Sequence, residues 1–247
     1  YFSIATSSKT SAVLDVAGGS TSDGANVQVY GSNRSLAQKW RIAKVADRDN
    51  TYTIESLLSG KVLAADESGN VCVRGLSNSD SQYWTAEIGN GKVVLLNVAN
   101  GKVLDISNNG ANVQTYKANG TAAQSFKLMS CSPFEAGTYT VLLAAARSKA
   151  LDVSSGSRSN GANIQIWDSN GSGAQKWYVT ANSDGTYCFQ NCRSKKFLDV
   201  LNGQGTSDAN VQQWQGNGSI AQRWRVEYTG NGGFAIRSAL NSSLVLD

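Results

Sequence analysis

The segments Leu14-Asp15-Val16, Asn26-Val27-Gln28-Val29-Tyr30 and Ala37-Gln38-Lys39-Trp40 form a pattern that returns throughout this chain of 247 residues. The third segment has four further copies, at Ser81–Trp84, Ala123–Phe126, Ala174–Trp177 and Ala221–Trp224. In all five copies an Asn lies twelve residues before the Gln, so the copies are in register. The Leu that opens the pattern recurs roughly every 41 to 49 residues, a spacing typical of a modular repeat architecture.

Each repeat contains several short β-rich runs separated by Gly, Ser and Asn turns, which predicts an all-β fold. Three such units around a shared axis make a β-trefoil, and six make two trefoils in tandem. The only Pro, Pro133, marks the predicted boundary, near Met129–Pro133. We predict one domain at 1–130, with repeats at about 1–43, 44–88 and 89–130, and a second at 131–247, with repeats at about 131–181, 182–228 and 229–247.

The sixth repeat begins at Gly233-Phe234-Ala235-Ile236 and reaches Leu246-Asp247, without the Asn-x-Gln-x-aromatic and Gln-x-Trp parts. We therefore expect the second trefoil to be cropped in its last repeat, with strand edges and core exposed. Either residues after Asp247 or a partner would cover that region.

Alternation along the strands assigns the faces of each repeat. Val27 and Val29 point to the core, and Tyr30 points to the other side together with Gln28 and Asn26. By the same rule, Leu14 and Val16 are inside and Asp15 is outside. The Trp of Gln-x-Trp is expected in the core. Gln38 is expected to be a buried, satisfied amide that holds Asp15 from behind.

Each well-preserved repeat thus displays a carboxylate, amides and an aromatic ring, a set that suits a sugar. The ring offers a platform for the C–H face of a pyranose, and the polar groups pair with its hydroxyls. The candidate carbohydrate-binding residues are Asp15, Gln28, Tyr30, Asn33, Gln38, Asp105, Gln114, Tyr116, Asn119, Gln124, Asp152, Gln165, Trp167, Asn170, Gln175, Asp199, Gln212, Trp214, Asn217 and Gln222. Structural roles compete with this interpretation: Asp15 as the cap of a loop amide, Asn26 as a turn residue, Tyr30 as an ordinary surface aromatic.

The second repeat separates the two roles. Its Asp, Gln and aromatic positions hold Ala64, Cys72 and Arg74, whereas its Asn, Val and Gln-x-Trp residues are kept. Loss of the first set together predicts a site that no longer binds. Retention of the second set indicates residues that the fold requires.

With these motifs the chain resembles the ricin B-chain type lectins, the Gln-x-Trp β-trefoil family, which also occurs as carbohydrate-binding modules of secreted bacterial glycosidases. The resemblance covers essentially the whole chain. It implies that the Asp of Leu-Asp-Val binds sugar hydroxyls, that the aromatic stacks on the ring and that the Gln of Gln-x-Trp orients the Asp. The relatives that prefer galactose carry an Asn directly before that Gln. Here Ala37 and its copies occupy that position, so the resemblance does not single out galactose. We expect a galactose-type sugar or another hexose or pentose.

Composition argues against several other classes. The chain has no His, which removes the commonest general base and zinc ligand, and a repeat supplies one Asp where a glycosidase needs two facing carboxylates. We therefore expect no enzyme, no cofactor and no metal. The net charge of +4 is scattered, which argues against nucleic acid, and no apolar run is long enough for membrane insertion. The state of Cys72, Cys131, Cys188 and Cys192 stays open.

The expected function is multivalent, non-catalytic carbohydrate binding in a secreted or cell-surface protein, as a lectin or as the targeting module of a larger enzyme, toxin or surface protein. A protein-binding or inhibitory trefoil is the alternative, because the fold alone does not separate the two. A glycosidase fragment is the third possibility.

Overall fold

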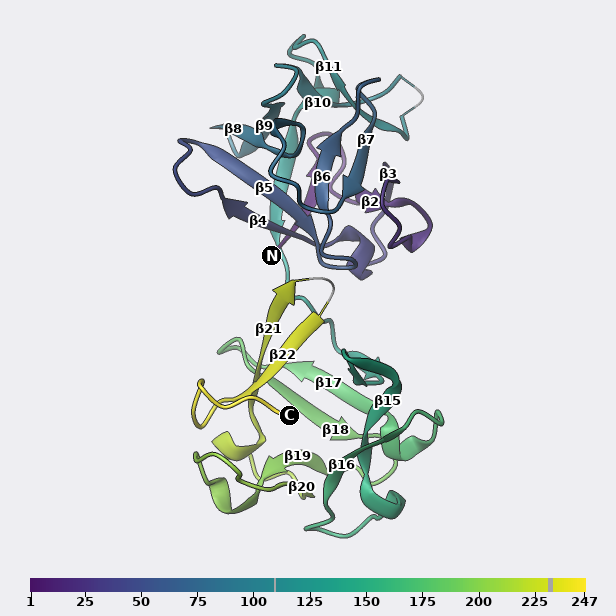
Figure 1. The fold of residues 1–247 in the computed structure, drawn as a ribbon, viewed down its shortest axis with the longest axis vertical. Helices are drawn as coiled ribbons and strands as arrows, with labels where there is room; N and C mark the ends of the chain where they lie inside the picture. The colour runs from purple at the N-terminus through teal and green to yellow at the C-terminus, as the bar shows by residue number, and fades with distance from the viewer. Residues whose placement is uncertain (109, 231–232) are drawn as a thin grey trace. The chain divides into compact units, whose positions relative to one another are not determined.

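The computed structural model describes residues 1–108, 110–230 and 233–247, and these form strands joined by turns and by short 3-10 helices (Figure 1). The chain divides into two compact units. Unit 1 is Tyr1–Pro133, and unit 2 consists of Phe134–Thr229 and Gly233–Asp247. The all-β fold predicted from the sequence is confirmed.

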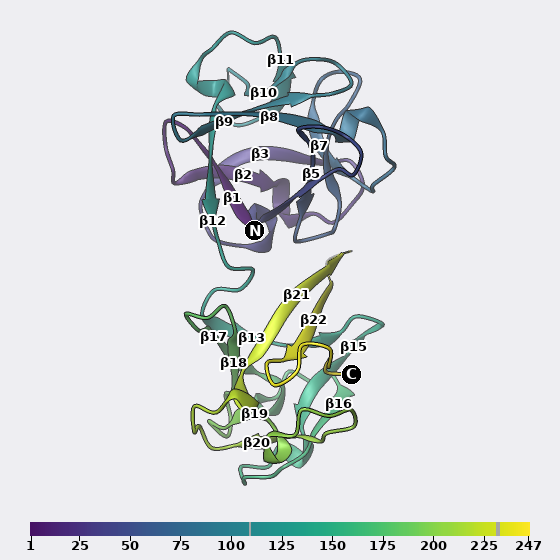
Figure 2. The same cartoon turned by 90° about the vertical axis from the view of Figure 1, so that its left-hand side faces the viewer.

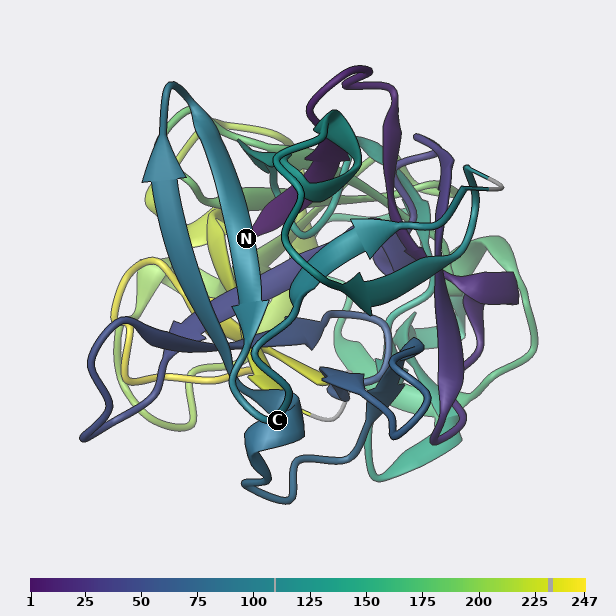
Figure 3. The same ribbon diagram turned by 90° about the horizontal axis from the view of Figure 1, so that it is seen from above.

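The barrel of unit 1 is a closed ring of six antiparallel strands: β1 (Phe2–Thr6), β4 (Trp40–Lys44), β5 (Thr51–Ser56), β8 (Trp84–Gly89), β9 (Lys92–Asn97) and β12 (Phe126–Ser130). Each strand pairs with the next in this order, and β12 returns to β1. Figure 2 shows β1 and β12 side by side, and Figure 3 shows β8 and β9 as a long blue-teal hairpin. Closure leaves the barrel without an edge strand.

Three hairpins close one end of this barrel: β2 (Ala12–Val16) with β3 (Ala25–Gly31), β6 (Val62–Ala65) with β7 (Val71–Arg74), and β10 (Val103–Ile106) with β11 (Val113–Tyr116). A barrel of six strands capped by three hairpins is a β-trefoil. The β2–β3 and β10–β11 hairpins carry the Leu-Asp-Val and Asn-x-Gln-x-aromatic parts of their repeats, and β6–β7 carries the degenerate copy, so the trefoil symmetry places the candidate sites around the cap.

The 3-10 helices fall at two places in the repeats. One set follows the Leu-Asp-Val strand: η1 (Ala17–Gly19), η5 (Ser154–Gly156) and η7 (Leu201–Gly203). The other set precedes the Trp or Phe of Gln-x-Trp: η2 (Leu36–Gln38), η3 (Asp80–Gln82), η4 (Ala122–Gln124), η6 (Gly173–Gln175) and η8 (Ile220–Gln222). The Gln of every Gln-x-Trp therefore ends a short helical turn.

The aromatic residues of Gln-x-Trp lie in the cores, as the sequence indicated. Trp40, Trp84 and Phe126 are fully buried in unit 1, and Trp177 and Trp224 are buried in unit 2. Each Trp Nε1 donates to the carbonyl of the Leu in its own Leu-Asp-Val segment, at 3.3 Å for Leu14 and 3.1 Å for Leu151. One contact thereby joins the barrel strand of each Trp-containing repeat to its hairpin.

Three asparagines join the hairpins of unit 1 on the pseudo-threefold axis. Nδ2 of Asn26 donates to Oδ1 of Asn112 at 3.0 Å, Asn112 donates to Asn70 at 2.9 Å, and Asn70 donates back to Asn26 at 3.0 Å. We considered Asn26 as a turn residue. Its side chain instead forms part of a ring of three asparagines. Isolated bridges between the hairpins, such as Gln28 with Asn112, lie beside the ring.

Unit 2 repeats this plan over two hairpins. Its barrel strands are β13 (Gly137–Tyr139), β17 (Trp177–Ala181), β18 (Tyr187–Asn191), β21 (Trp224–Gly230) and β22 (Gly233–Ser238). Its hairpins are β15 (Ala146–Val153) with β16 (Ile164–Asp168), and β19 (Phe197–Val200) with β20 (Val211–Trp214), and the short β14 (Leu142–Leu143) pairs with β15.

Where unit 1 has its third hairpin, the described part of unit 2 has a groove of about 660 Å³. Core side chains, among them Trp224 and Leu151, line it. Trp224 and Leu151 are themselves only 2 % and 3 % exposed, so the exposure expected for the cropped sixth repeat is limited to other lining residues, such as Ile166 and Val245.

Candidate functional site

A carboxylate and an amide face each other across the hairpin of every well-preserved repeat. Asp15 on β2 is the direct partner of Gln28 on β3, and Nε2 of Gln28 donates to Oδ1 of Asp15 at 3.0 Å. The same contact recurs as Gln114 to Asp105 at 2.9 Å, Gln165 to Asp152 at 3.0 Å and Gln212 to Asp199 at 2.9 Å. The register of the hairpin therefore builds this pair without help from the rest of the fold.

The prediction that these carboxylates point outward needs a correction. Asp15 and Asp105 are each only 5 % exposed, and Asp152 and Asp199 are exposed to a similar extent. Alternation does place them opposite the core, but the turn that carries the Gln of Gln-x-Trp contacts the hairpin and covers them. A ligand would therefore meet a recessed carboxylate edge.

The Gln of Gln-x-Trp holds its own turn together through two hydrogen bonds to the backbone, an arrangement that we call the clamp. Gln38 is buried, its Oε1 accepts from the backbone N–H of Asn33 at 2.8 Å, and its Nε2 donates to the carbonyl of Gly31 at 3.0 Å. Gln124, Gln175 and Gln222 make the equivalent pair of contacts. This clamp fixes the loop that follows the exposed aromatic.

In two repeats the same amide also reaches the carboxylate. Nε2 of Gln38 lies 3.0 Å from Oδ2 of Asp15, and Nε2 of Gln222 lies 3.0 Å from Oδ2 of Asp199. In these sites each carboxylate oxygen accepts one amide proton. Because a carboxylate oxygen accepts along two lone-pair directions, each keeps capacity for a hydroxyl.

The aromatic residues of the sites lie on the surface. Tyr30, Tyr116 and Trp167 are 55 %, 53 % and 54 % exposed, which is unusual for rings of this size. Trp214, the fourth, is half-buried. Each follows the Gln of the Asp–Gln pair by two residues on the same strand, so ring and carboxamide share one face.

The four asparagines three positions after these rings have a structural task. Oδ1 of Asn33 accepts from the backbone N–H of Ser35 at 2.9 Å, and Asn119, Asn170 and Asn217 make the same turn. Oδ1 of each asparagine therefore already has one backbone partner, and the predicted contact of these residues with a sugar stays a prediction. The Nδ2 group is the donor that they can offer.

The second repeat keeps the clamp and lacks the binding set. Gln82 accepts from the N–H of Ser77 at 2.8 Å and donates to the carbonyl of Gly75 at 2.7 Å, although Ala64 stands where the other repeats carry Asp. Cys72, in place of Gln, is buried, and burial raises the pKa of its thiol. The clamp is therefore independent of the carboxylate.

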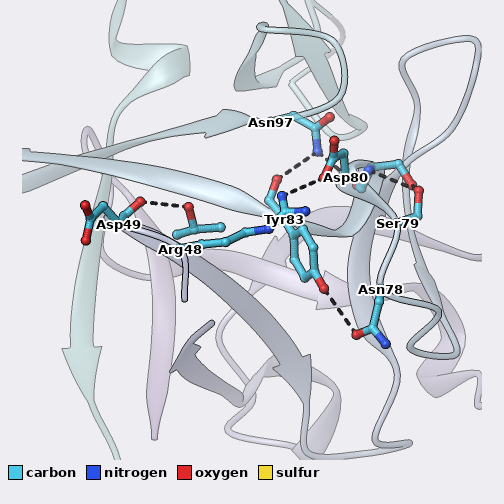
Figure 4. A network of polar contacts seen from close by, with 9 residues as sticks. Arg48, Asp49, Asn78, Ser79, Asp80, Tyr83 and Asn97 are labelled. Carbon is cyan, nitrogen blue, oxygen red and sulfur yellow. Dashed lines mark hydrogen bonds and ion pairs between the residues drawn. The ribbon is translucent and has the colours of Figure 1, made fainter. Parts of the chain in front are cut away.

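A polar network covers the Gln-x-Trp turn of this repeat (Figure 4). The Arg48 guanidinium lies 4.6 Å from the centroid of the Tyr83 ring and 2.6 Å from Oδ1 of Asp80. The hydroxyl of Tyr83 donates to Oδ1 of Asn78 at 3.1 Å. The charged turn around Arg48 thus packs against its own repeat, and we assign it a structural role.

Contacts between neighbouring repeats are a feature that sequence reasoning missed. Oδ1 of Asp23, in the loop of the first repeat, accepts from the N–H of Gly75 in the second at 2.7 Å. Oδ1 of Asn160, the corresponding loop residue of the fourth repeat, accepts from the N–H of Gln215 in the fifth at 2.9 Å. The one signal in the sequence was loop length, since both residues lie in long loops between the Asp and Asn positions.

Other features of the described residues bear on the class of protein. No group of three His, Cys, Asp or Glu side chains among them could hold a metal ion, and they contain no helix long and apolar enough to cross a membrane. Cys188 and Cys192, whose spacing left a bridge open, form no disulfide. Their sulfurs lie near Asn182 and Thr138, respectively.

Comparison with known families agrees with this geometry. A family model described as "Ricin-type beta-trefoil lectin domain-like" matches residues 1–73, 80–167 and 173–247. The chain belongs to this family. The matched segments contain nineteen of the twenty candidate residues, all but Asn170, and the resemblance inferred from the sequence motifs is confirmed.

Solved structures similar to this ricin-type trefoil chain include a designed threefold-symmetric protein, ThreeFoil. It is 30 % identical, with a TM-score of 0.49, over 53 % of this chain and 98 % of its own. A mosquitocidal holotoxin is 20 % identical, with a TM-score of 0.51, over 100 % of this chain and 30 % of its own. The C-half of an earthworm R-type lectin in complex with GalNAc is 19 % identical, with a TM-score of 0.41, over 51 % of this chain and 95 % of its own. No curated protein matches the chain.

Proposed function

We propose that this chain is a multivalent, non-catalytic carbohydrate-binding protein with one shallow site in each of the first, third, fourth and fifth repeats. The observation that carries the proposal is the recurrence of one arrangement, an Asp–Gln pair beside an aromatic ring on the same strand. In three of the four sites the ring is more than half exposed. The ricin-type lectin family and the earthworm lectin structure with GalNAc support the same class of ligand.

The chemistry of each proposed site follows from its atoms. The exposed face of Tyr30, or of its counterparts, packs against the C–H face of a pyranose. The edge of Asp15, with lone pairs left beside its two amide contacts, accepts from hydroxyls of the sugar, and a charged acceptor makes these hydrogen bonds stronger than neutral ones. The Nδ2 group of Asn33 supplies a donor at the rim.

The number of sites determines the avidity of the chain for a surface that displays many glycans. One shallow site of this kind binds weakly, whereas several sites on one chain gain on the order of 100-fold or more when a glycan or a glycan-coated surface spans them. We infer that the chain acts where glycans are displayed in many copies. A lectin, or the targeting module of a larger secreted or cell-surface protein, has this task.

Catalysis is disfavoured by the same geometry. Hydrolysis of a glycosidic bond uses two carboxylates that flank the bond, about 5 to 9.5 Å apart. Asp15 is surrounded by the amides of Gln28 and Gln38, and its repeat supplies no second carboxylate to the hairpin pair. The site holds a sugar and offers no acid or base partner.

A glycan array tests the proposal. The chain is compared with a variant that carries Tyr30→Ala, Tyr116→Ala, Trp167→Ala and Trp214→Ala, because the exposure of these rings makes them safer to remove than the buried carboxylates. Tyr178→Ala is the matched control, since Tyr178 is also an exposed ring (42 %) but belongs to no candidate site.

Binding of a defined glycan class by the chain and by Tyr178→Ala, with loss in the fourfold variant, supports the proposal. If the chain binds no glycan, or if the fourfold variant binds as well as the chain, carbohydrate binding at these sites is wrong. A protein-binding or inhibitory trefoil then becomes the leading interpretation.

A further inference from the structure

The proposed site of the fifth repeat contacts a loop of the fourth repeat. That loop connects β15 to β16, and its end pairs with β20: the N–H of Gly161 donates to the carbonyl of Gln213, and the N–H of Gln213 donates to the carbonyl of Ala162, both at 2.9 Å. Asn163 and Gln212 form a further bridge. Figure 1 shows β16, β19 and β20 together at one end of unit 2.

A buried side chain fixes this loop in place. Gln213 is fully buried, and its Nε2 donates to the carbonyls of Ser157 and Ser159 at 3.0 and 2.9 Å. Its Oε1 accepts from the hydroxyl of Ser194 at 2.6 Å. The corresponding positions of the other repeats hold Val29, Val73, Thr115 and Ile166, none of which carries an amide. The loop is therefore ordered before any ligand binds, which lowers the entropic cost of binding.

The tip of the loop stands beside the aromatic platform. A Cβ built on Gly161 would lie 3.9 Å from Cζ3 of Trp214 and 3.7 Å from Oε1 of Gln212, so the Gly161 backbone flanks the indole. This position has a φ of +79°, which favours glycine. Trp214 is half-buried, with Gly161 on one flank and Phe197 as its cross-strand partner, whereas Tyr30, Tyr116 and Trp167 are more than half exposed.

Asn160 presents a polar group next to this flank. Its Oδ1 is engaged with the N–H of Gln215 at 2.9 Å. Its Nδ2 has only a long contact, 3.4 Å, with Oε1 of Gln215, and Asn160 is exposed. An amide nitrogen has two protons, so Nδ2 of this exposed residue keeps donor capacity.

The first repeat has a different residue at this position and borders a different kind of site. Its loop carries Asp23 at the position of Asn160, and Asp23 contacts Gly75, but the second repeat offers Ala64 and Arg74 in place of Asp and the aromatic. Asp23 therefore borders a degenerate site and is held there by Lys61 at 3.1 Å.

We propose that the fifth-repeat site is a composite of two repeats, in which Asn160 contacts the second ring of a glycan whose first ring lies on Trp214. Asn160 makes this site selective for a ligand of at least two sugars. The proposal rests on the carbohydrate-binding function proposed above and adds a specificity-determining residue to it.

The test isolates the fifth site in the full chain. In the variant Tyr30→Ala, Tyr116→Ala, Trp167→Ala, the remaining tryptophans other than Trp214 are Trp40, Trp84, Trp177 and Trp224, all buried. The change in fluorescence on adding sugar therefore reports on Trp214. The probes are galactose against lactose and xylose against xylobiose.

The expected result is tighter binding of one disaccharide than of its monosaccharide. Asn160→Ala should weaken the disaccharide by about two- to tenfold, the effect of one neutral hydrogen bond, and leave the monosaccharide unchanged. Asn160→Asp keeps the acceptor for the N–H of Gln215 but has no Nδ2 donor, so it should weaken the disaccharide as well. Asp23→Ala is the matched control and should change neither.

Each other outcome overturns the composite site. Equal binding of mono- and disaccharide, no response to any of the four sugars, or an unchanged Asn160→Ala variant would each do so. Loss in Asn160→Ala with full binding in Asn160→Asp would make Asn160 a turn residue that only positions Gln215. If the unmodified chain also binds nothing on the glycan array, the proposed function itself is wrong. If the unmodified chain does bind a glycan on the array, only the role proposed for Asn160 is wrong.

Discussion

Nε2 of Gln38 lies 3.0 Å from Oδ2 of Asp15, in a repeat where Gln28 already occupies Oδ1 of the same carboxylate. The carboxylate is thus joined both to its own hairpin and to the turn that precedes the core Trp40. A residue that we propose as a ligand contact is here also part of the framework. The fifth repeat has the same double contact at Asp199.

Removal of the carboxylate should therefore cost stability as well as binding. We predict that Asp15→Ala lowers the free energy of unfolding of unit 1 by about 1 to 3 kcal/mol, because two amide donors lose a charged acceptor. Asp105→Ala should cost less, since Gln114 is the glutamine that donates to that carboxylate. Urea denaturation of the two variants measures the difference, and equal costs would contradict the framework role of the second contact.

The contribution of the indole N–H of the core tryptophans to the free energy of unfolding should be measurable in the same way. Trp40→Phe removes the donor to the carbonyl of Leu14 from a fully buried site, with an expected loss of about 1 to 3 kcal/mol. Trp167→Phe, at a ring that is 54 % exposed, is the control and should stay within about 0.5 kcal/mol of the unmodified protein. A loss at Trp167 as large as that at Trp40 would refute the assignment of the two rings to core and surface.

The asparagine ring of unit 1 should behave as one unit. Asn70→Ala breaks two of its three hydrogen bonds, and so does Asn26→Ala. We expect either variant to lose about 1 to 3 kcal/mol, and the double variant to lose less than the sum because the two share one bond. A double-mutant cycle measures this coupling, and strict additivity would mean that the ring does not act as a unit.

Acid should weaken unit 2 through Asp184. Its pKa is lowered from 3.8 to about 2, first by the hydroxyl of Thr186, then by the N–H of Thr186, with Arg223 adding less. A lowered pKa in the folded state means that the stabilisation is complete above about pH 4 and is lost as the pH falls through about 2.

NMR titration of the Asp184 carboxyl group tests the order of these causes. Thr186→Val should raise its pKa more than Arg223→Gln does, because the hydroxyl of Thr186 is the largest cause. The reverse order would show that the ion pair with Arg223 governs the titration.

The proposed valency should appear as a gap between two kinds of measurement. Binding to a dense glycan surface should fall on the order of tenfold or more when two of the rings Tyr30, Tyr116 and Trp167 become Ala, because avidity depends on the number of sites. The affinity of each remaining site for free sugar should not change. Surface plasmon resonance and calorimetry give the two quantities, and parallel losses in both would point to a single site.

Strand alternation and repetition predicted the paired residues and much of the core, although Val29 is only partly buried and Ile166, assigned by the same rule, is exposed. Val27 is buried and Gln28 faces Asp15 because the pattern within one hairpin determines both. Burial of Asp15 itself could not be predicted in this way. Alternation assigns a face of the strand, but the cover comes from η2, more than twenty residues later.

Contacts that need more than one repeat were also outside what the sequence showed. The ring of Asn26, Asn70 and Asn112 exists only after three hairpins close around an axis, and no single copy of the motif contains it. The contact of Asn160 with Gln215 has the same origin. Both join positions more than forty residues apart, and a motif that is shorter than one repeat carries no information on them.

The loop of one repeat contacts the hairpin of a neighbouring repeat, so the surroundings of a proposed site depend on a loop outside its own repeat. A deletion in the loop that carries Asn160 would leave Asp152 and Trp167 of its own repeat intact and would change the surroundings of Trp214. Changes of loop length during evolution would then alter the surroundings of a proposed site in the neighbouring repeat, and not of the site in the repeat where they occur. For this chain, a change in specificity should be traced to the preceding loop before it is traced to the binding residues themselves.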